Sequence, residues 1–182
     1  FKGDGFDDLA ANQNFFPMQP ETGRLNGGLG LLMLGDGKGA FRALMERESG
    51  ILLPGDGRAL VVEDINGDHR PDLLASANLG PLSVFINKSK NGVPLCLKFS
   101  GGKGNLRAAG SRVFLNYQNG RRKLCQLTLG SSHLSAPDPH LFVVQLPGNP
   151  IESVTILSPL GKESTHSLTG KSGLIRIPVV TR

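Results

Sequence analysis

The loop at residues 64–72 constrains this chain more than any other stretch, and it reads Asp-Ile-Asn-Gly-Asp-His-Arg-Pro-Asp. Side chains that contain oxygen fall at its first, third, fifth and ninth positions. Ca²⁺ binds about 6–8 oxygen ligands at about 2.3–2.6 Å, and a tight loop with oxygens on alternate residues can surround such an ion. The expected ligands are the side chains of Asp64, Asn66, Asp68 and Asp72, together with the backbone carbonyl of Arg70.

The loop differs from an EF-hand, and an interpretation without an ion stays open beside the metal site. An EF-hand needs a bidentate Glu at its twelfth position, where this chain has Ala75. The residues that follow, 73–78, favour a short buried strand. A plain Asp/Asn/Gly turn between two strands is the alternative. However, three carboxylates within nine residues repel one another unless a cation lies among them, and this favours the metal site.

A partial copy of the loop lies at the start of the chain. Asp4 and Asp8 correspond to Asp68 and Asp72 at an offset of 64 residues. An apolar segment follows each copy, at residues 29–34 and at residues 82–86. Repeats of this size, with several short strands in each, are typical of β-propeller blades.

The first copy lacks part of the ligand set. Lys2 occupies its third position, and its first position would precede Phe1. We therefore expect Asp4 and Asp8 to form a weak second site or none. Without an initiator Met, the sequence also reads as a piece of a longer, processed protein.

These residues point to a known repeat family. The pattern Asp-x-Asn-x-Asp-x-x-x-Asp-Leu, followed by Val-Phe-Ile-Asn at residues 84–87, resembles the FG-GAP/VCBS repeats of integrin-like propellers. The resemblance covers residues 1–92 and is most specific at residues 60–88. It implies a Ca²⁺ ion between the strands of a blade, bound by Asp64, Asn66, Asp68 and Asp72. His69 stands where Gly is usual, so we expect some strain in the turn.

The second half resembles a different module. Residues 105–113, Asn-Leu-Arg-Ala-Ala-Gly-Ser-Arg-Val, are similar to the opening of the ASPIC/UnbV domain, and residues 130–135, 138–142 and 154–162 are similar to its middle and its last strand. The chain departs from that family at His133, where Tyr is usual, at Ser158, where Trp is usual, and at residues 143–146. The resemblance implies architecture and a secreted context, and no reaction.

The residues of the second half indicate β structure on their own. Short apolar runs lie at residues 95–99, 111–117, 123–129, 140–146, 151–157 and 173–178, separated by turn residues. Such spacing is typical of an antiparallel sandwich or small barrel. The best helical candidate is residues 41–48. We therefore expect an all-β chain, with partial β-propeller-like repeat blades at residues 1–92 followed by an antiparallel β-sandwich at residues 93–182.

Charge divides the chain at the same place. The first half has a net charge of −3 and the second +8, which together give the formal +5. The basic half favours attraction to acidic glycans, or to the acidic half of another copy, although a solvated surface is the simpler interpretation. Nucleic acid is not favoured, because no recognition motif appears. No apolar run approaches the ~18 residues that a membrane span needs.

Other reactive residues do not form a convincing site in the sequence. The alternation of residues places Cys96 beside Lys98, and Cys125 beside Leu127, which argues against a disulfide. Several catalytic residue types are close together in the sequence, namely Ser131, Ser132, His133, Ser135, Asp138 and His140. Nothing there imitates a nucleophile elbow or a zinc motif, so we expect loop residues and no enzyme.

The sequence therefore predicts a secreted or cell-surface, calcium-binding module without catalytic activity. Its function would be adhesion, surface assembly or protein interaction, with a protein partner, self-association or an acidic glycan. The alternative is a carbohydrate-binding accessory region of a secreted enzyme.

Overall fold

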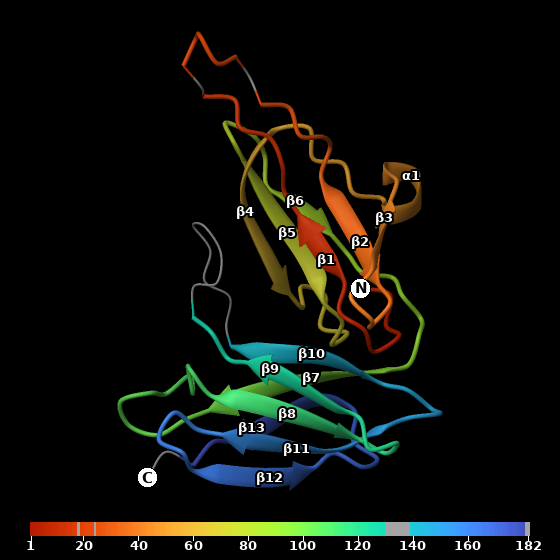
Figure 1. Cartoon of the computed structure of the whole chain (residues 1–182), viewed down its shortest axis with the longest axis vertical. Helices are drawn as coiled ribbons and strands as arrows, with labels where there is room; N and C mark the ends of the chain where they lie inside the picture. Colours follow the sequence, from red (N-terminus) through yellow and green to blue (C-terminus); the bar gives the residue numbers. More distant parts are fainter. Residues whose placement is uncertain (18, 24, 130–138, 181–182) are drawn as a thin grey trace.

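The structure is a computed structural model that describes residues 1–17, 19–23, 25–129 and 139–180. Strands contain 46% of the residues and helix 2%, which confirms the all-β expectation. The strands form four small sheets, none of which closes on itself in this part of the chain (Figure 1). None of the described helices is long and apolar enough to cross a membrane.

The first half contains two antiparallel sheets of three strands each. The first sheet has the order β1 (Leu9–Ala11), β2 (Leu31–Gly35), β3 (Phe41–Leu44), and the second has the order β4 (Asp56–Glu63), β5 (Asp72–Asn78), β6 (Ser83–Phe85). The short helix α1 (Glu46–Ser49) lies in the connection between them.

The prediction of a helix over residues 41–48 is wrong in its first half. Residues 41–44 form β3, because they pair antiparallel with β2. Only Glu46–Ser49 is helical. The Glu48 carboxylate accepts a hydrogen bond from the Met45 N–H, and Gly50 ends the helix in the left-handed conformation with a φ of 70°.

The second half also has two sheets. A three-stranded sheet has the order β10 (His140–Gln145), β7 (Val93–Ser100), β13 (Gly173–Pro178), and a four-stranded sheet has the order β12 (Glu163–Ser167), β11 (Ile151–Leu157), β8 (Arg112–Tyr117), β9 (Arg122–Gln126). All six expected runs contain a strand. The expectation of a purely antiparallel arrangement is wrong, because β13 runs parallel to β7.

Strand β12 was not predicted from the sequence. It reads Glu-Ser-Thr-His-Ser and has no apolar residue, so its alternation gives no hydrophobic signal. It forms at the edge of its sheet because it pairs with β11 over five residues.

Two separate clusters of buried residues stabilise the two halves. The first contains Leu32, Ile51, Leu53, Leu73 and Ala75. The second lies between residues 95 and 179 and draws on both sheets of the second half. Leu95, Leu97 and Phe99 point into this second cluster and Cys96 does not, as the alternation along β7 predicted. Burial of apolar area at about 25 cal/mol per Å² is the main stabilising term for each cluster.

Two strand pairs of the first half have a matching register. Leu9 on β1 pairs with Met33 on β2, and Leu73 on β5, which is 64 residues further on, pairs with Phe85 on β6. Strands β1 and β2 therefore correspond to β5 and β6. Within the described residues, β6 has no neighbour equivalent to β3, and β1 has none equivalent to β4.

Candidate metal centre

The predicted metal loop connects β4 to β5, and its first aspartate organises the turn. Asp64 Oδ1 accepts hydrogen bonds from the backbone N–H groups of Gly67 (2.8 Å) and Asp68 (3.1 Å). Asp64 Oδ2 accepts one from the N–H of His69 (2.9 Å). The carboxylate thus holds the loop backbone around itself, as Asp does in turns.

The next side chains gather beside Asp64. Asp68 Oδ1 accepts a hydrogen bond from the Arg70 N–H (2.9 Å), and Asn66 Nδ2 donates to Asp68 Oδ2 (3.1 Å). Gly67 and His69 have φ angles of 79° and 65°. Because a residue with a Cβ pays a steric cost in this left-handed region, the strain expected at His69 is confirmed.

Asp72 has a structural task of its own. Its side chain is fully buried, Oδ2 accepts from the Ile65 N–H (3.0 Å), and Oδ1 accepts from the Asn87 N–H (2.7 Å). The carboxylate therefore ties the start of the loop to the segment that follows β6. We call this pair of contacts the aspartate bracket.

The donor set fits a cation in part. Each carboxylate oxygen has two lone pairs, so oxygens of Asp64, Asp68 and Asp72 retain acceptor capacity beyond the bonds described. An ion would need Asn66 to turn its amide oxygen, rather than its NH₂ group, toward Asp68. In the described part of the chain, no three His, Cys, Asp or Glu side chains are already arranged to hold a metal. Calcium binding therefore stays a prediction.

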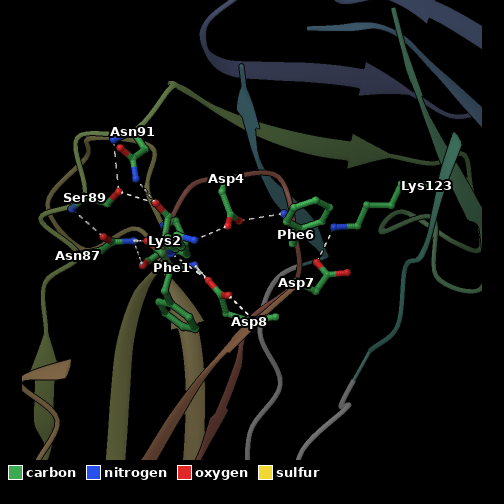
Figure 2. Close-up of polar contacts among 12 residues, drawn as sticks. Phe1, Lys2, Asp4, Phe6, Asp7, Asp8, Asn87, Ser89, Asn91 and Lys123 are labelled. Atoms are coloured by element: carbon green, nitrogen blue, oxygen red, sulfur yellow. Dashed lines mark hydrogen bonds and ion pairs between the residues drawn. The ribbon is translucent and has the colours of Figure 1, made fainter. Parts of the chain in front are cut away.

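The N-terminal loop repeats the aspartate bracket (Figure 2). Asp8 Oδ2 accepts from the terminal ammonium of Phe1 (2.9 Å) and from the Lys2 N–H (2.9 Å), and Oδ1 accepts from the Gly35 N–H (3.1 Å). Phe1 lies 64 residues before Ile65, and Gly35 follows Met33 as Asn87 follows Phe85. Burial alone would raise the pKa of Asp8, but these hydrogen bonds and the ammonium charge outweigh it and lower the pKa.

Asp4 repeats the position of Asp68. Its Oδ1 accepts from the Phe6 N–H (3.2 Å), and its Oδ2 forms an ion pair with Lys2 Nζ (3.0 Å; Figure 2). Gly3 and Gly5 have φ angles of 75° and 84°, close to those of Gly67 and His69. The Lys2 ammonium thus contacts Asp4 as the Asn66 amide contacts Asp68, and it supplies a positive charge within the protein.

Both loops face the second half of the chain. Lys123 Nζ forms an ion pair with Asp7, and His140 Nε2 lies 3.3 Å from Glu63 Oε1. The Arg121 guanidinium lies 4.9 Å from the centre of the Phe6 ring. This interface was not predicted from the sequence, although the opposite net charges of the two halves are a signal for it.

A cavity of about 260 Å³ lies between the loops and the second half. Asp7, Arg70, Tyr117, Lys123 and Phe142 are among its lining residues, so aromatic, acidic and basic groups meet there. Cavities of this kind between two parts of a chain are common ligand sites.

The two cysteines and the Ser/His cluster have separate outcomes, and of that cluster only His140 is described, where it lines the cavity. Cys96 and Cys125 are both free thiols. Burial, with smaller contributions from Asp64 and Glu63, raises the pKa of Cys96 to about 11. His140 is placed on β10, whereas Ser131, Ser132, His133, Ser135 and Asp138 lie outside the described residues.

Comparison with known proteins assigns no family to this geometry. No model of a protein family matches the chain, and no curated protein matches it significantly.

Proposed function

We propose that the chain is a secreted or cell-surface calcium-binding module that functions in adhesion, surface assembly or protein interaction and has no catalytic activity. Residues 1–92 would belong to FG-GAP/VCBS-like propeller blades, and residues 93–182 to an ASPIC/UnbV-like β-sandwich. Ca²⁺ would be bound by Asp64, Asn66, Asp68, Asp72 and the carbonyl of Arg70.

The observation that best supports this proposal is the difference between two loops of equal backbone shape. Both have the aspartate bracket and two left-handed residues. At the third position the loop at residues 64–72 has the amide oxygen of Asn66, whereas the N-terminal loop has Lys2, whose ammonium pairs with the fifth-position aspartate Asp4. The Lys2 ammonium thus supplies beside Asp4 the positive charge that a bound cation would supply beside Asp68.

The ion would act by stabilising structure. It would neutralise carboxylates between β4 and β5, and these strands contribute Leu60, Leu73 and Ala75 to the first core cluster. A ligand that binds only the native state stabilises it by about 2.7 kcal/mol at a hundredfold excess over Kd. Extracellular modules bind Ca²⁺ with Kd values of about 10⁻⁴–10⁻³ M, which suits a site that stays loaded outside the cell.

Isothermal calorimetry tests the proposal. Wild type is expected to bind one Ca²⁺ per chain, and Asp68→Ala should lose that binding. Asp4→Ala is the matched control at the equivalent position of the N-terminal loop, and it should bind as wild type does. Equal Ca²⁺ binding by wild type and Asp68→Ala, or none by wild type, would reject the assignment.

The cavity between the halves favours a second candidate, the carbohydrate-binding accessory region. Aromatic rings beside charged and amide groups are suitable for a sugar, and Phe6, Tyr117 and Asn87 line this cavity. A glycan array separates the two candidates. Selective binding of one sugar class that Tyr117→Ala removes would support this one, whereas binding of acidic glycans in general would reflect the +8 half.

A further inference from the structure

Two connections of the second half lie side by side at one end of its four-stranded sheet. One joins β7 to β8 at residues 101–111, and the other joins β11 to β12 at residues 158–162. The end of β11 pairs with the start of β8, and a Cβ on Gly110 would lie 3.4 Å from Pro159 Cγ, so the two connections approach within van der Waals reach. Both lie at the left end of the second half (Figure 1). We call these two connections the loop pair.

Each member of the loop pair exposes a leucine. Leu106 is 74% exposed, and Leu160 is 73% exposed. Among the described residues, the core cluster of the second half contains neither of them. Because apolar side chains stabilise a fold by leaving water, these two leucines contribute little to the stability of the second half. They are therefore available to another molecule.

Hydrogen bonds within each connection hold its shape. In the first, the Asn105 side chain accepts from the Ala109 N–H and donates to the Ala109 carbonyl, both at 2.9 Å. In the second, the Ser158 N–H donates to the Lys162 carbonyl (2.8 Å), and the Lys162 N–H donates to Ser158 Oγ (3.1 Å). Backbone groups paired in this way can enter apolar surroundings without the cost that unpaired polar groups incur.

The loop pair and the first residue of β8 are basic. Residues 100–112 and 158–162 contain no Asp or Glu. Their basic residues are Lys103, Arg107, Arg112 and Lys162. Glu163, at the start of β12, is the one acidic residue that adjoins this set in the chain. Exposed leucines among basic residues are complementary to an anionic lipid surface, where Lys and Arg meet the head groups and Leu the acyl boundary.

Another exposed leucine of the chain lacks this setting. Leu79, in the turn between β5 and β6, is fully exposed. Residues 73–85 contain no charged side chain. A single exposed leucine is common on protein surfaces. The combination of two leucines on adjoining loops with basic residues around them therefore distinguishes the loop pair.

We propose that the loop pair docks on the surface of a bilayer that contains anionic lipid. Leu106 and Leu160 enter the boundary between head groups and acyl chains, and the basic residues contact the anionic head groups. The contact lies on one side of the bilayer and requires no membrane span. It combines an apolar and an electrostatic contribution, and binding strength at such interfaces scales with both. This inference goes beyond the proposed function, and it is independent of the cation site.

Sedimentation with vesicles tests the docking, with chelator present so that Ca²⁺ does not bridge protein and lipid. Wild type is expected to bind vesicles of equal parts phosphatidylserine and phosphatidylcholine, less tightly as the salt concentration rises, and not to bind pure phosphatidylcholine. Leu106→Ser combined with Leu160→Ser should weaken binding about tenfold or more without a change in charge. Lys103→Gln combined with Lys162→Gln should weaken binding about 25-fold, at about fivefold for each charge. Leu79→Ser, the matched control, should bind as wild type does.

Fluorescence provides a second measurement, because the chain contains no Trp. Leu160→Trp places a single Trp at an exposed site, where it should leave the fold intact. Its emission should shift to shorter wavelength with the mixed vesicles, since Trp favours the membrane interface and becomes less accessible to water there. Leu79→Trp should show no shift.

Any one of several results would overturn the inference. Wild type that does not bind the mixed vesicles, or that binds pure phosphatidylcholine equally well, would do so. Equal binding by wild type and the double leucine variant would reduce the contact to adsorption of charge, and equal weakening by Leu79→Ser would show general adhesion of exposed leucines. If the double leucine variant does not keep the thermal unfolding transition of wild type, the two Trp variants decide, and no shift for Leu160→Trp rejects the docking. Asp68→Ala should bind vesicles as wild type does, so this inference and the cation site can each fail without the other.

Discussion

The N-terminal loop and the loop at residues 64–72 share a backbone shape and differ in side chains. In each, an aspartate with a buried side chain accepts an N–H from the start of its own loop. It accepts another from Gly35, the last residue of β2, or from Asn87, two residues after β6. In each, an aspartate four residues earlier accepts an N–H two residues further on. The third position differs, since Lys2 stands where the other loop has Asn66.

This comparison separates two tasks that one acidic motif combines. The aspartate bracket and the left-handed residues shape the loop without any ion, because backbone N–H groups satisfy the carboxylates. Asp64 also shapes its loop, because it accepts three backbone N–H groups. The third position is different, since the N-terminal loop keeps its shape with Lys2 where the other loop has Asn66. Asn66 is therefore the residue whose presence favours a ligand set over a plain turn.

The largest effect is expected from removal of the bracket in the loop at residues 64–72, where the Asp72 side chain is fully buried. Asp72→Ala leaves the N–H groups of Ile65 and Asn87 without their partner, and it should destabilise the protein by about 3 kcal/mol. Asp8→Ala should cost about 1–2 kcal/mol, because the Lys2 N–H that it serves is exposed and can turn to water. Urea unfolding with chelator present measures both without a contribution from Ca²⁺.

Asp36→Ala is the control for these variants. Asp36 accepts N–H groups of Lys38 and Ala40 in an exposed turn, so its loss should cost less than either bracket. An Asp36 variant as unstable as Asp72→Ala would show that the bracket has no special energetic role.

The second prediction concerns acid. The pKa of Asp8 lies below its ordinary value of 3.8 in the folded chain, so its contacts contribute their full stability above that pH. This stability is lost as the pH falls through the lowered pKa. Asp8→Asn should therefore be less stable than wild type at pH 6, and the difference should shrink below pH 3.8. A difference that stays constant down to full unfolding would contradict this role of the Asp8 charge.

Much of the fold followed from the sequence, because strand residues here alternate or cluster in the usual way. The alternation along the chain revealed the shared face of Leu95, Leu97 and Phe99. The positive φ of His69 followed from the glycine that the repeat pattern favours there.

Other features depend on tertiary partners that no local pattern encodes. The strand at residues 41–44 forms because β2 is beside it, and β12 forms without an apolar residue because β11 pairs with it. The parallel pairing of β13 with β7, and the contact of His140 with Glu63, join residues that are distant in sequence. The role of Asp72 in the bracket was hidden as well, since a ligand and a structural carboxylate look alike in a motif.

The smallest effect is expected from exchange of the left-handed residue between the loops. His69→Gly relieves the strain at a φ of 65° but adds freedom to the unfolded chain, so it should stabilise by about 0.5–1 kcal/mol. Gly5→His should destabilise by about 1 kcal/mol, since a Cβ there would meet Leu146 Cδ1 at 3.2 Å. Urea unfolding measures the change in the free energy of unfolding for each variant. Changes of the same sign would disprove the equivalence of the two positions.

Hydrogen exchange with Ca²⁺ and with chelator tests the central difference between the loops most directly. Removal of Ca²⁺ should reduce protection first in the strands that flank the loop, at residues 59–63 and 73–77. The N-terminal loop should change little, because Lys2 already pairs with Asp4. Residues from about 94 onward should also change little, because they have a separate core. Equal loss of protection at both loops, or a uniform loss across both halves, would contradict the account.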